Sequence, residues 1–404
     1  MLVENVMLEQ AIALLLENTE EIRTTEEAEL LSALGRVCAE TVYAPRDIPP
    51  FDRSPLDGYA LQSVHTQGAT KERPAVFEVI GEVCAGGYFA AAAHVGQAVR
   101  IMTGAPIPEG CDCVVRQEHV ALNADGRLQV PYALAAHEAY CFRGEDIARG
   151  IELVRAGEKL GAAHLGVLAS VGLAKVKVRC LPRIVFCSTG DELTVPGEPL
   201  LPGKIYNSNF YTLAGRFHEL GFAPVLLSGL PDDADAVAAK IREYAPETAL
   251  FVTTGGVSVG KKDILHPAIR ELGAERLFWK VGLKPGGPVL SYRYKNMLGI
   301  ALSGNPFAAL TTFELLVRPV LAKLSGRPEL VCTAGEAVLA DDFLKASPGR
   351  RFVRAVCREG KAHLPGGDAS GMLLTAARCN AFVDIPAGTQ ALHRGDTVRM
   401  VYYR

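Results

Sequence analysis

The sequence lacks the features that mark several common classes of protein. It has no uninterrupted run of about 18 apolar residues, the length that a membrane-spanning helix needs. Its first residues carry acids where a signal peptide carries lysines or arginines. Neither a C-x-x-C pair nor an H-E-x-x-H motif occurs, which argues against a zinc hydrolase. We therefore expect a cytoplasmic protein that has no membrane partner and whose ten cysteines are reduced, buried thiols.

An excess of basic residues is also absent. The formal net charge is −3 over 404 residues, which provides no general attraction for nucleic acid or acidic lipid. Hydrophobic residues make up 49% and charged residues 22% of the chain, as in globular proteins. At about 100 to 200 residues per domain, the length predicts about two to four domains. Any anionic ligand must be bound by local groups, and no nucleic-acid partner is expected.

The first part of the chain contains helical segments that flank a β-rich stretch. Apolar residues recur at helical spacing in residues 5–18 and 26–34, and again in residues 160–171. Residues 44–60 hold four prolines and three aspartates, a composition typical of an irregular connection. Short β-type runs between residues 76 and 131 indicate a small all-β module. The module is predicted to be an insertion at residues 46–146 between two parts of one linker domain, residues 1–45 and 147–180.

The central part of the chain alternates between strand and helix patterns. Apolar runs begin near Ile184, Pro224 and Leu250, and helical segments separate them at residues 211–220 and 234–244. This order predicts a parallel, doubly wound sheet, whose ligands bind beyond the carboxyl ends of its strands. The candidate ligand loops are those that follow the predicted strands, namely residues 188–192, 229–233, 254–263 and 303–306.

The last part of the chain changes pattern once more. From residue 335 onward apolar and polar residues alternate, with glycine and proline turns between the runs. We assign residues 181–327 to an α/β domain and residues 328–404 to a C-terminal β barrel or sandwich. The predicted fold class is therefore a multidomain α/β plus β protein.

Two of the candidate loops carry signals for an anion. Gly255, Gly256 and Gly260 allow backbone N–H groups to converge around a phosphate, although a tight turn would need similar residues. Asn305 is a strong helix N-cap and Pro306 suits the first helical position. The N-terminus of the helix that follows would be a second anion site.

The glycine-rich loop also comes close to a different motif. Residues 255–261 nearly match the phosphate-binding loop of P-loop NTPases. That motif needs Ser or Thr after its lysine to hold Mg²⁺, and Lys262 cannot coordinate a cation. Pro267 also falls early in the helix that should follow the loop. An NTPase is therefore not favoured.

Six short motifs occur in order along the chain, at residues 50–60, 101–106, 143–146, 188–192, 254–260 and 303–306. Together they resemble the motifs of the molybdopterin molybdenumtransferase family, the MoeA family, which is similar to the gephyrin E domain. The resemblance covers the whole chain. It implies a homodimeric enzyme that inserts molybdate into adenylylated molybdopterin and releases AMP, with Mg²⁺ assisting. A molybdopterin adenylyltransferase and molybdoenzyme maturation proteins would be its partners.

The resemblance also implies roles for individual residues. The carboxylates expected to hold Mg²⁺ are Asp57, Asp146, Glu192, Asp232, Asp233 and Asp263. The catalytic residues are expected to be Asp57, Glu192 and Asp263, with Lys280 and Lys284 facing phosphate or molybdate. The residues expected to bind the pterin substrate are Thr103, Ser188, Thr189, Gly190, Gly255, Gly256, Ser258, Gly304, Asn305, Arg350 and Ser370. In the family the β module of one subunit leans over the α/β domain of the other, so Asp57 and Thr103 are expected to act in trans.

Some alternatives remain open on the sequence alone. Lys280 and Lys284 could equally be solvated lysines at the edge of a strand. Arg350 could equally be a cation in a turn. The chain departs from the family at three positions, where Ser303 replaces a usual Pro, Gly287 a usual Lys and Lys261 a frequent acid. Tungstate is an alternative to molybdate as the cargo. The alternative functions are a molybdopterin adenylyltransferase, against which the β module and C-terminal domain argue, and a non-catalytic scaffold.

Overall fold

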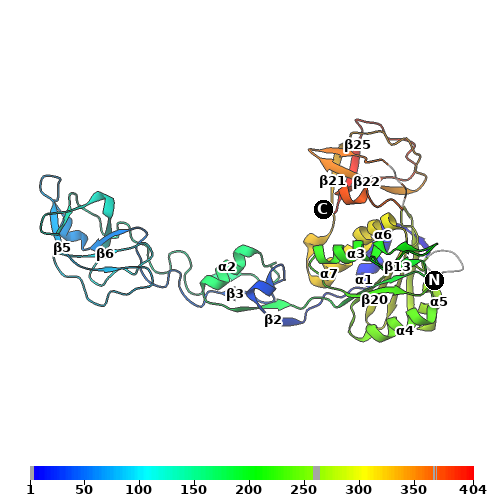
Figure 1. The fold of residues 1–404 in the computed structure, drawn as a ribbon, viewed down its shortest axis with the longest axis horizontal. Helices are drawn as coiled ribbons and strands as arrows, with labels where there is room; N and C mark the ends of the chain where they lie inside the picture. Colours follow the sequence, from blue (N-terminus) through cyan, green and yellow to red (C-terminus); the bar gives the residue numbers. More distant parts are fainter. Residues whose placement is uncertain (1–3, 258–263, 367–368, 370) are drawn as a thin grey trace. The chain divides into compact units, whose positions relative to one another are not determined.

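The computed structural model describes residues 4–257, 264–366, 369 and 371–404, and the chain forms two compact units (Figure 1). One unit combines Met1–Glu26 with Arg179–Arg404, and the other is Glu27–Val178. No helix in the described part of the chain is long and apolar enough to cross a membrane.

A seven-stranded sheet forms the centre of the larger unit. In spatial order its strands are β1 (Glu4–Val6), β17 (Glu275–Val281), β19 (Leu290–Tyr294), β20 (Met297–Leu302), β16 (Leu250–Thr254), β12 (Ile184–Thr189) and β15 (Val225–Leu230). The four strands from β20 to β15 are parallel, as predicted. In contrast to the prediction of a wholly parallel sheet, β19 is antiparallel to both β17 and β20. The reason is the short connection between β19 and β20, in which Lys295 has φ of 57°, because so short a link can join only antiparallel strands.

Helices cover both faces of this sheet, which confirms the doubly wound architecture. Alternate side chains of β12 point to opposite faces. Ile184 and Phe186 belong to the core shared with α1 (Leu8–Glu17) and α3 (Ser208–Glu219), to which the helices α6 (Pro306–Thr312) and α7 (Arg318–Ser325) also contribute. Val185 and Cys187 belong to a second core with α4 (Ala234–Tyr244) and α5 (Leu265–Glu271), which Figure 1 shows on the other face.

The N-terminal residues differ in part from the sequence prediction. The helix predicted at residues 5–18 is confirmed as α1, but β1 joins the central sheet beside β17, and α1 packs against α7 and β17. The linker was predicted to begin with residues 1–45. Of these, Met1–Glu26 belong to the larger unit, and the rest belong to the smaller unit. The helix predicted at residues 26–34 is wrong. The strand β2 (Thr25–Glu29) and a 3₁₀ turn at Leu30–Ala33 take its place, because pairing of β2 with β11 (Lys175–Arg179) overrides the local helical pattern.

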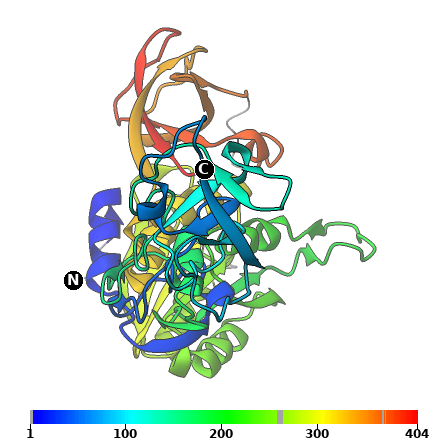
Figure 2. The ribbon, with the colours of Figure 1, turned by 90° about the vertical axis from the view of Figure 1, so that its left-hand side faces the viewer.

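The C-terminal region is a closed β barrel, which confirms the predicted β domain. Its strands follow the order β22 (Arg350–Arg358), β23 (Lys361–His363), β21 (Thr333–Leu339), β25 (Thr397–Tyr402) and β24 (Ala381–Ile385), and β24 pairs back with β22. A short strand of the α/β domain, β18 (Leu283–Lys284), runs parallel to the start of β22. In Figure 2 the barrel is orange to red, and the segment between β13 (Leu193–Thr194) and β14 (Ile205–Tyr206) extends in green away from the sheet.

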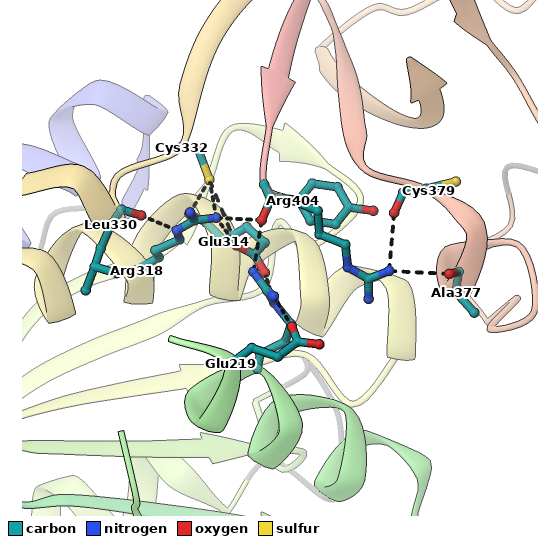
Figure 3. Close-up of polar contacts among 10 residues, drawn as sticks. Glu219, Glu314, Arg318, Leu330, Cys332, Ala377, Cys379 and Arg404 are labelled. Atoms are coloured by element: carbon teal, nitrogen blue, oxygen red, sulfur yellow. Dashed lines mark hydrogen bonds and ion pairs between the residues drawn. The ribbon is translucent and has the colours of Figure 1, made fainter. Parts of the chain in front are cut away.

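A buried ionic cluster joins the barrel to the α/β domain (Figure 3). Glu314 lies on a π-helical turn, Phe313–Val317, which precedes Pro319, a residue whose missing N–H and bulky ring disturb the helix before it. Its carboxylate accepts from Arg216 Nε at 2.6 Å and from Arg318 Nη1 at 2.9 Å. Both arginines also donate to the carbonyl of Tyr403 at the end of the chain. The cluster therefore fixes the C-terminus of the barrel to α3 and α7.

The smaller unit contains the predicted β module. Its six-stranded sheet has the order β7 (Cys113–Arg116), β4 (Gly58–Leu61), β6 (Gln97–Ile101), β5 (Ala75–Val83), β9 (Leu128–Val130) and β8 (Ala121–Leu122). The sequence analysis predicted short β-type runs between residues 76 and 131. Four strands of this sheet coincide with those runs, namely β5, β6, β7 and β9. The predicted helix at residues 160–171 is also confirmed, as α2 (Ala162–Ser170), and β3 (Val42–Tyr43) pairs with β10 (Glu152–Val154).

Candidate active site

A cavity of about 1500 Å³ lies beyond the carboxyl ends of the parallel strands in the larger unit. Its walls come from the loops that follow β12, β15, β16 and β20, from β18 and the turn after it, from the first residues of α3 and α6, and from the barrel. Pockets for single small molecules are usually about 300 to 1,000 Å³. This one is therefore large enough for a ligand of dinucleotide size together with a second small substrate.

Nine of the residues predicted for the site line this single cavity, although they come from separate segments of the sequence. The candidate loops therefore line one cavity, and the binding of a ligand by these residues stays a prediction. The residues are Thr189, Gly190, Glu192, Asp232, Gly255, Gly256, Lys284, Gly304 and Asn305.

The two glycines after β16 allow a very close approach of backbone segments. A Cβ at Gly255, where φ is 91°, would lie 2.4 Å from the carbonyl oxygen of Thr189. The amide of Gly255 donates to the carbonyl of Leu302 at 3.2 Å and so is not directed at a ligand. The glycine therefore serves the packing of two strand ends rather than the predicted phosphate cradle, at least at this position. Ser258, Gly260, Lys261, Lys262 and Asp263 lie outside the described residues.

The loop after β20 enters α6 as the sequence predicts. Asn305 is the N-cap and Pro306 the first helical residue. The side chain of Asn305 makes no capping hydrogen bond. The backbone amide of Asn305 donates to Ser303 Oγ at 3.3 Å. Asn209 of α3 donates to the carbonyl of Gly304 at 2.7 Å, which ties this loop to the first turn of α3. Asn207 and Asn209 line the cavity and were missed, although Asn-Ser-Asn after β14 is a polar signal at a helix start.

Charges of opposite sign line different walls of the cavity. Glu192 and Asp232 lie on the loops after β12 and β15, whereas Lys284 lies on β18. Asp232 and Asp191 hold these two loops together, since each backbone amide donates to the other carboxylate, at 3.1 and 3.4 Å. The barrel adds three cations to the lining that the sequence analysis did not single out, namely Lys345, Arg351 and Arg354.

Two of the cations are neighbours in the β structure. Lys284 and Arg351 are register partners in the parallel pair of β18 and β22, so both side chains belong to the same face. Like charges in opposed positions of adjacent strands destabilise a sheet unless a counter-charge lies nearby. The cation-lined wall is therefore suited to an anionic ligand, and the carboxylate-lined wall to a metal ion or a hydrogen-bond donor.

The carboxylates predicted to hold Mg²⁺ are divided by the structure. Among the described residues no three Asp, Glu, His or Cys side chains gather into a metal-binding group. Asp233 caps α4 by accepting from the amide of Ala236 at 2.7 Å and is not in the cavity lining, while Asp57 and Asp146 belong to the smaller unit. Glu192 and Asp232 remain in the cavity. Because Mg²⁺ usually takes one or two carboxylates and completes its shell with water and phosphate oxygens, these two residues fit the ion.

Two other predicted residues, Ser188 and Lys280, lie outside the lining of the cavity. The buried Ser188 Oγ accepts from Asn207 Nδ2 at 2.8 Å and from the amide of Gly229 at 3.2 Å, so it supports the loops from behind. Lys280 has φ of 65°, and its Nζ lies 5.5 Å from the Trp279 ring centroid. Ser370 lies outside the described residues.

Arg350 is engaged elsewhere, and its neighbour lines the cavity instead. The Arg350 guanidinium donates to both oxygens of Asp384, each at 2.8 Å, and also to Glu9 of α1. This pairing holds the pKa of the Glu9 carboxyl below its usual value. The two carboxylates thus engage Arg350, and of this adjacent pair it is Arg351 that lines the cavity.

Two of the three departures from the family pattern also lie in this cavity. Ser303 is buried and lines it beside Gly304. At Gly287 a Cβ would lie 3.2 Å from the carbonyl oxygen of Leu283, which is tight. A side chain at this position would therefore require a small movement of β18.

Asp57 and Thr103 meet in the smaller unit, although their motifs are far apart in the sequence. Asp57 Oδ1 accepts from both the amide and the hydroxyl of Thr103, each at 2.7 Å. The antiparallel pairing of Gly58 with Ile101 brings the two segments together. The amide of Thr103, and then its hydroxyl, lower the pKa of the Asp57 carboxyl. Asp57 is thus held as an anion in a fixed orientation.

This contact gives a local prediction. Thr103→Val removes the hydroxyl donor and leaves the amide donor, so the pKa of Asp57 should rise part of the way toward its ordinary value. A ¹³C NMR titration of the Asp57 carboxyl measures the change, and Thr70→Val in the same unit is the matched control. An unchanged Asp57 pKa in Thr103→Val would show that the hydroxyl does not stabilise the carboxylate.

Comparisons with known proteins show the family of the chain. Three family models match the chain, described as MoeA N-terminal region (domain I and II) for residues 6–172, Probable molybdopterin binding domain for residues 186–323, and MoeA C-terminal region (domain IV) for residues 336–402. The molybdopterin molybdenumtransferase of Bacillus subtilis (strain 168) is 38% identical over 389 residues, which cover 94% of this chain and 90% of that protein. The chain belongs to the MoeA family.

Other members of the MoeA family show the same extent of similarity. The molybdopterin molybdenumtransferase of Staphylococcus aureus (strain MSSA476) is 34% identical over 376 residues, which cover 92% of this chain and 90% of that protein. Two crystal structures of MoeA proteins from Pyrococcus horikoshii are 30% identical, cover 99% of this chain and 99% and 100% of theirs, and have TM-scores of 0.83 and 0.78. The MoeA fold therefore extends over the whole chain.

Proposed function

We propose that this chain is a molybdopterin molybdenumtransferase that acts in molybdenum cofactor biosynthesis. It takes adenylylated molybdopterin and molybdate, inserts the metal into the dithiolene and releases AMP. Relatives that carry this name align over more than nine-tenths of the chain. The observation that carries the proposal is the large cavity with carboxylates on one wall and cations on another, lined by the region matched as a probable molybdopterin binding domain and by the region matched as MoeA C-terminal.

The charges of the cavity suit this chemistry. Release of AMP breaks a pyrophosphate bond, and such reactions depend on positioning and on groups that stabilise the charge of the phosphates. Lys284 and Arg351 offer positive charge to phosphate or molybdate oxygens. Glu192 and Asp232 would hold Mg²⁺, which when bound supplies positive charge to the phosphate oxygens.

The test is the release of AMP from adenylylated molybdopterin by the purified protein, with and without molybdate. We expect release that depends on molybdate. Formation of adenylylated molybdopterin from ATP and molybdopterin would support the adenylyltransferase alternative instead. The absence of turnover, with the pterin still bound, would support the scaffold alternative.

We further infer that the enzyme works in the cytoplasm as a homodimer and receives its substrate from a molybdopterin adenylyltransferase. The family resemblance implies that Asp57 and Thr103 act in trans on substrate bound by the partner subunit. Symmetric dimers are the commonest assemblies of identical chains. Size-exclusion chromatography with light scattering should give the mass of two chains.

Action in trans predicts complementation between two inactive variants. In a mixture of Asp57→Ala and Glu192→Ala chains, half of the dimers are hybrids in which one of two sites is intact, so about a quarter of wild-type activity should return. Different affinity tags on the two variants verify that subunits have exchanged. If exchange is complete and no activity returns, each site is built within one chain.

A further inference from the structure

Ser303 places a hydroxyl in the wall of the cavity, and the protein does not use its proton. The residue follows β20, is 9% exposed and lines the cavity. Its Oγ accepts from the amide of Asn305 at 3.3 Å, and no group among the described residues accepts the hydroxyl proton in return. A serine hydroxyl has one donor and two acceptor positions. Because a buried donor without an acceptor costs free energy, this hydroxyl is suited to donate to a ligand.

Position 287 lies close to this hydroxyl. Leu290 of β19 pairs with Ala301 of β20 in antiparallel register. The same register, continued by two residues, sets Pro288 opposite Ser303, and opposed residues in such a pair are about 5 Å apart. Gly287 is thus the neighbour of the residue that faces Ser303, and it lines the same cavity.

The turn that holds Gly287 also packs against α6, the helix that begins just after Ser303. A Cβ at Gly286 would lie 3.1 Å from the carbonyl oxygen of Ala308, so the turn and the helix are in close contact. Lys284 stands just before this turn and lines the cavity. A hydroxyl donor and an ammonium are therefore carried into the cavity by two segments that meet at the start of α6.

This chain differs from the family pattern at both positions, since the pattern has proline at position 303 and lysine at position 287. The side chain of proline has no donor, whereas lysine carries a cation with three donors. The chain thus gains a neutral donor and loses a cation within one part of the cavity. An anion bound between the two positions would be held by a hydrogen bond in place of a charge.

We propose that Ser303 donates a hydrogen bond to a tetrahedral oxyanion of the substrates. Molybdate and the phosphate of the adenylylated pterin share this chemistry, and binding experiments distinguish them. The inference rests on the proposed function and adds a residue on which oxyanion affinity in this chain depends. Lys284 and Arg351 supply the positive charge of the cavity, and Ser303 supplies a directed donor.

The test measures binding of molybdate alone and of AMP alone by titration calorimetry, in the wild type and in Ser303→Ala. We expect the affinity for at least one of the two ions to fall by about tenfold or more, the scale of a lost hydrogen bond to a charged group. Ser303→Thr keeps the hydroxyl and should restore most of the affinity. A fall for molybdate alone assigns the hydroxyl to the cargo, and a fall for AMP alone assigns it to the phosphate.

Two results of these titrations would overturn the inference. One is wild-type affinity for both ions in Ser303→Ala, which would show that the hydroxyl contributes nothing to oxyanion binding. The other is failure of the wild type to bind either ion.

Ser291 offers a matched control. It lies on β19 near the same end of the sheet, is fully buried and does not line the cavity. Its Oγ donates to the carbonyl of Gly299 at 3.1 Å, so its proton is already used. Ser291→Ala should leave the affinity for both ions unchanged. Equal weakening in Ser291→Ala and Ser303→Ala would reduce the effect to general loss of structure and overturn the inference.

A cation at position 287 tests whether the two positions share the anion. Gly287→Lys adds the cation, and Gly287→Ala makes the same steric demand on the carbonyl oxygen of Leu283 without a charge. If one anion is shared, Ser303→Ala should cost less affinity in the Gly287→Lys background than in the Gly287→Ala background. Equal costs in the two backgrounds would overturn the placement of the anion between these positions.

Ion binding separates this inference from the proposed function, because it requires no turnover. Ion affinity that depends on Ser303, in a protein that releases no AMP from adenylylated molybdopterin, would contradict the proposed function alone. Molybdate-dependent release of AMP, together with unchanged ion affinity in Ser303→Ala, would contradict the role of Ser303 alone.

Discussion

Replacement of Glu192 by glutamine should lower molybdate-dependent AMP release by about 100-fold or more, the scale of losing about 2.7 kcal/mol of transition-state electrostatic stabilisation. Glu192 lines the carboxylate side of the cavity and lies against Gly190, where a Cβ would be 2.9 Å from its Oε2. Glutamine keeps the shape of the side chain and removes its charge. The fold should therefore survive, while the concentration of Mg²⁺ needed for half-maximal activity should rise.

Glu198 provides the control for this change. It lies six residues further along the chain, between β13 and β14, is exposed, and is not part of the cavity lining. Glu198→Gln should therefore keep wild-type turnover. Near-normal turnover in Glu192→Gln, with the fold verified by circular dichroism, would exclude Glu192 from the catalytic role that we assign to it.

Replacement of Glu314 by alanine should cause the largest loss of stability, about 3 to 5 kcal/mol of the free energy of unfolding. The carboxylate of Glu314 is fully buried and bridges Arg216 and Arg318, whose side chains are 6% and 11% exposed. Removal of the shared carboxylate leaves two buried cations close together. The cluster also holds the carbonyl of Tyr403, so the attachment of the barrel should weaken at the same time.

Glu219 is the matched control, because it also pairs with Arg216 but is 56% exposed. Glu219→Ala should cost only about 0 to 1 kcal/mol, as surface ion pairs usually do. Urea unfolding followed by tryptophan fluorescence, which reports on Trp279 in the central sheet, measures both variants. Equal losses in the two variants would mean that burial of the Glu314 cluster does not determine its contribution.

Local patterns in the sequence predicted much of the architecture. The helix at residues 234–244 and the entry into α6 at Asn305 and Pro306 are encoded within a few neighbouring residues, and the structure reproduces both. The alternation of strand and helix indicated the edge of the sheet at which the cavity lies. These features depend on short-range periodicity and capping, which a single sequence displays directly.

Features that depend on distant partners were harder to predict. The segment at residues 26–34 has a helical pattern but pairs with β11, which lies far along the chain. Arg350 and Arg351 are adjacent and chemically identical, and the pairing of β22 with β18 together with the distant carboxylates of Glu9 and Asp384 determines which of the two lines the cavity. No local pattern in the sequence contains that information. The family resemblance implied that Asp57 and Thr103 serve the same site, but their contact was not predicted, and the pairing of β4 with β6 explains it.

The most direct test of the central claim is the ratio of molybdenum bound to the pterin to AMP released in a single turnover. Purified protein, adenylylated molybdopterin, Mg²⁺ and molybdate are mixed, and the pterin-bound metal and the free AMP are quantified in the same sample. Insertion coupled to AMP release predicts one molybdenum atom for each AMP, and almost no AMP when molybdate is omitted. Release of AMP at the same rate without molybdate, with no metal on the pterin, would contradict the claim.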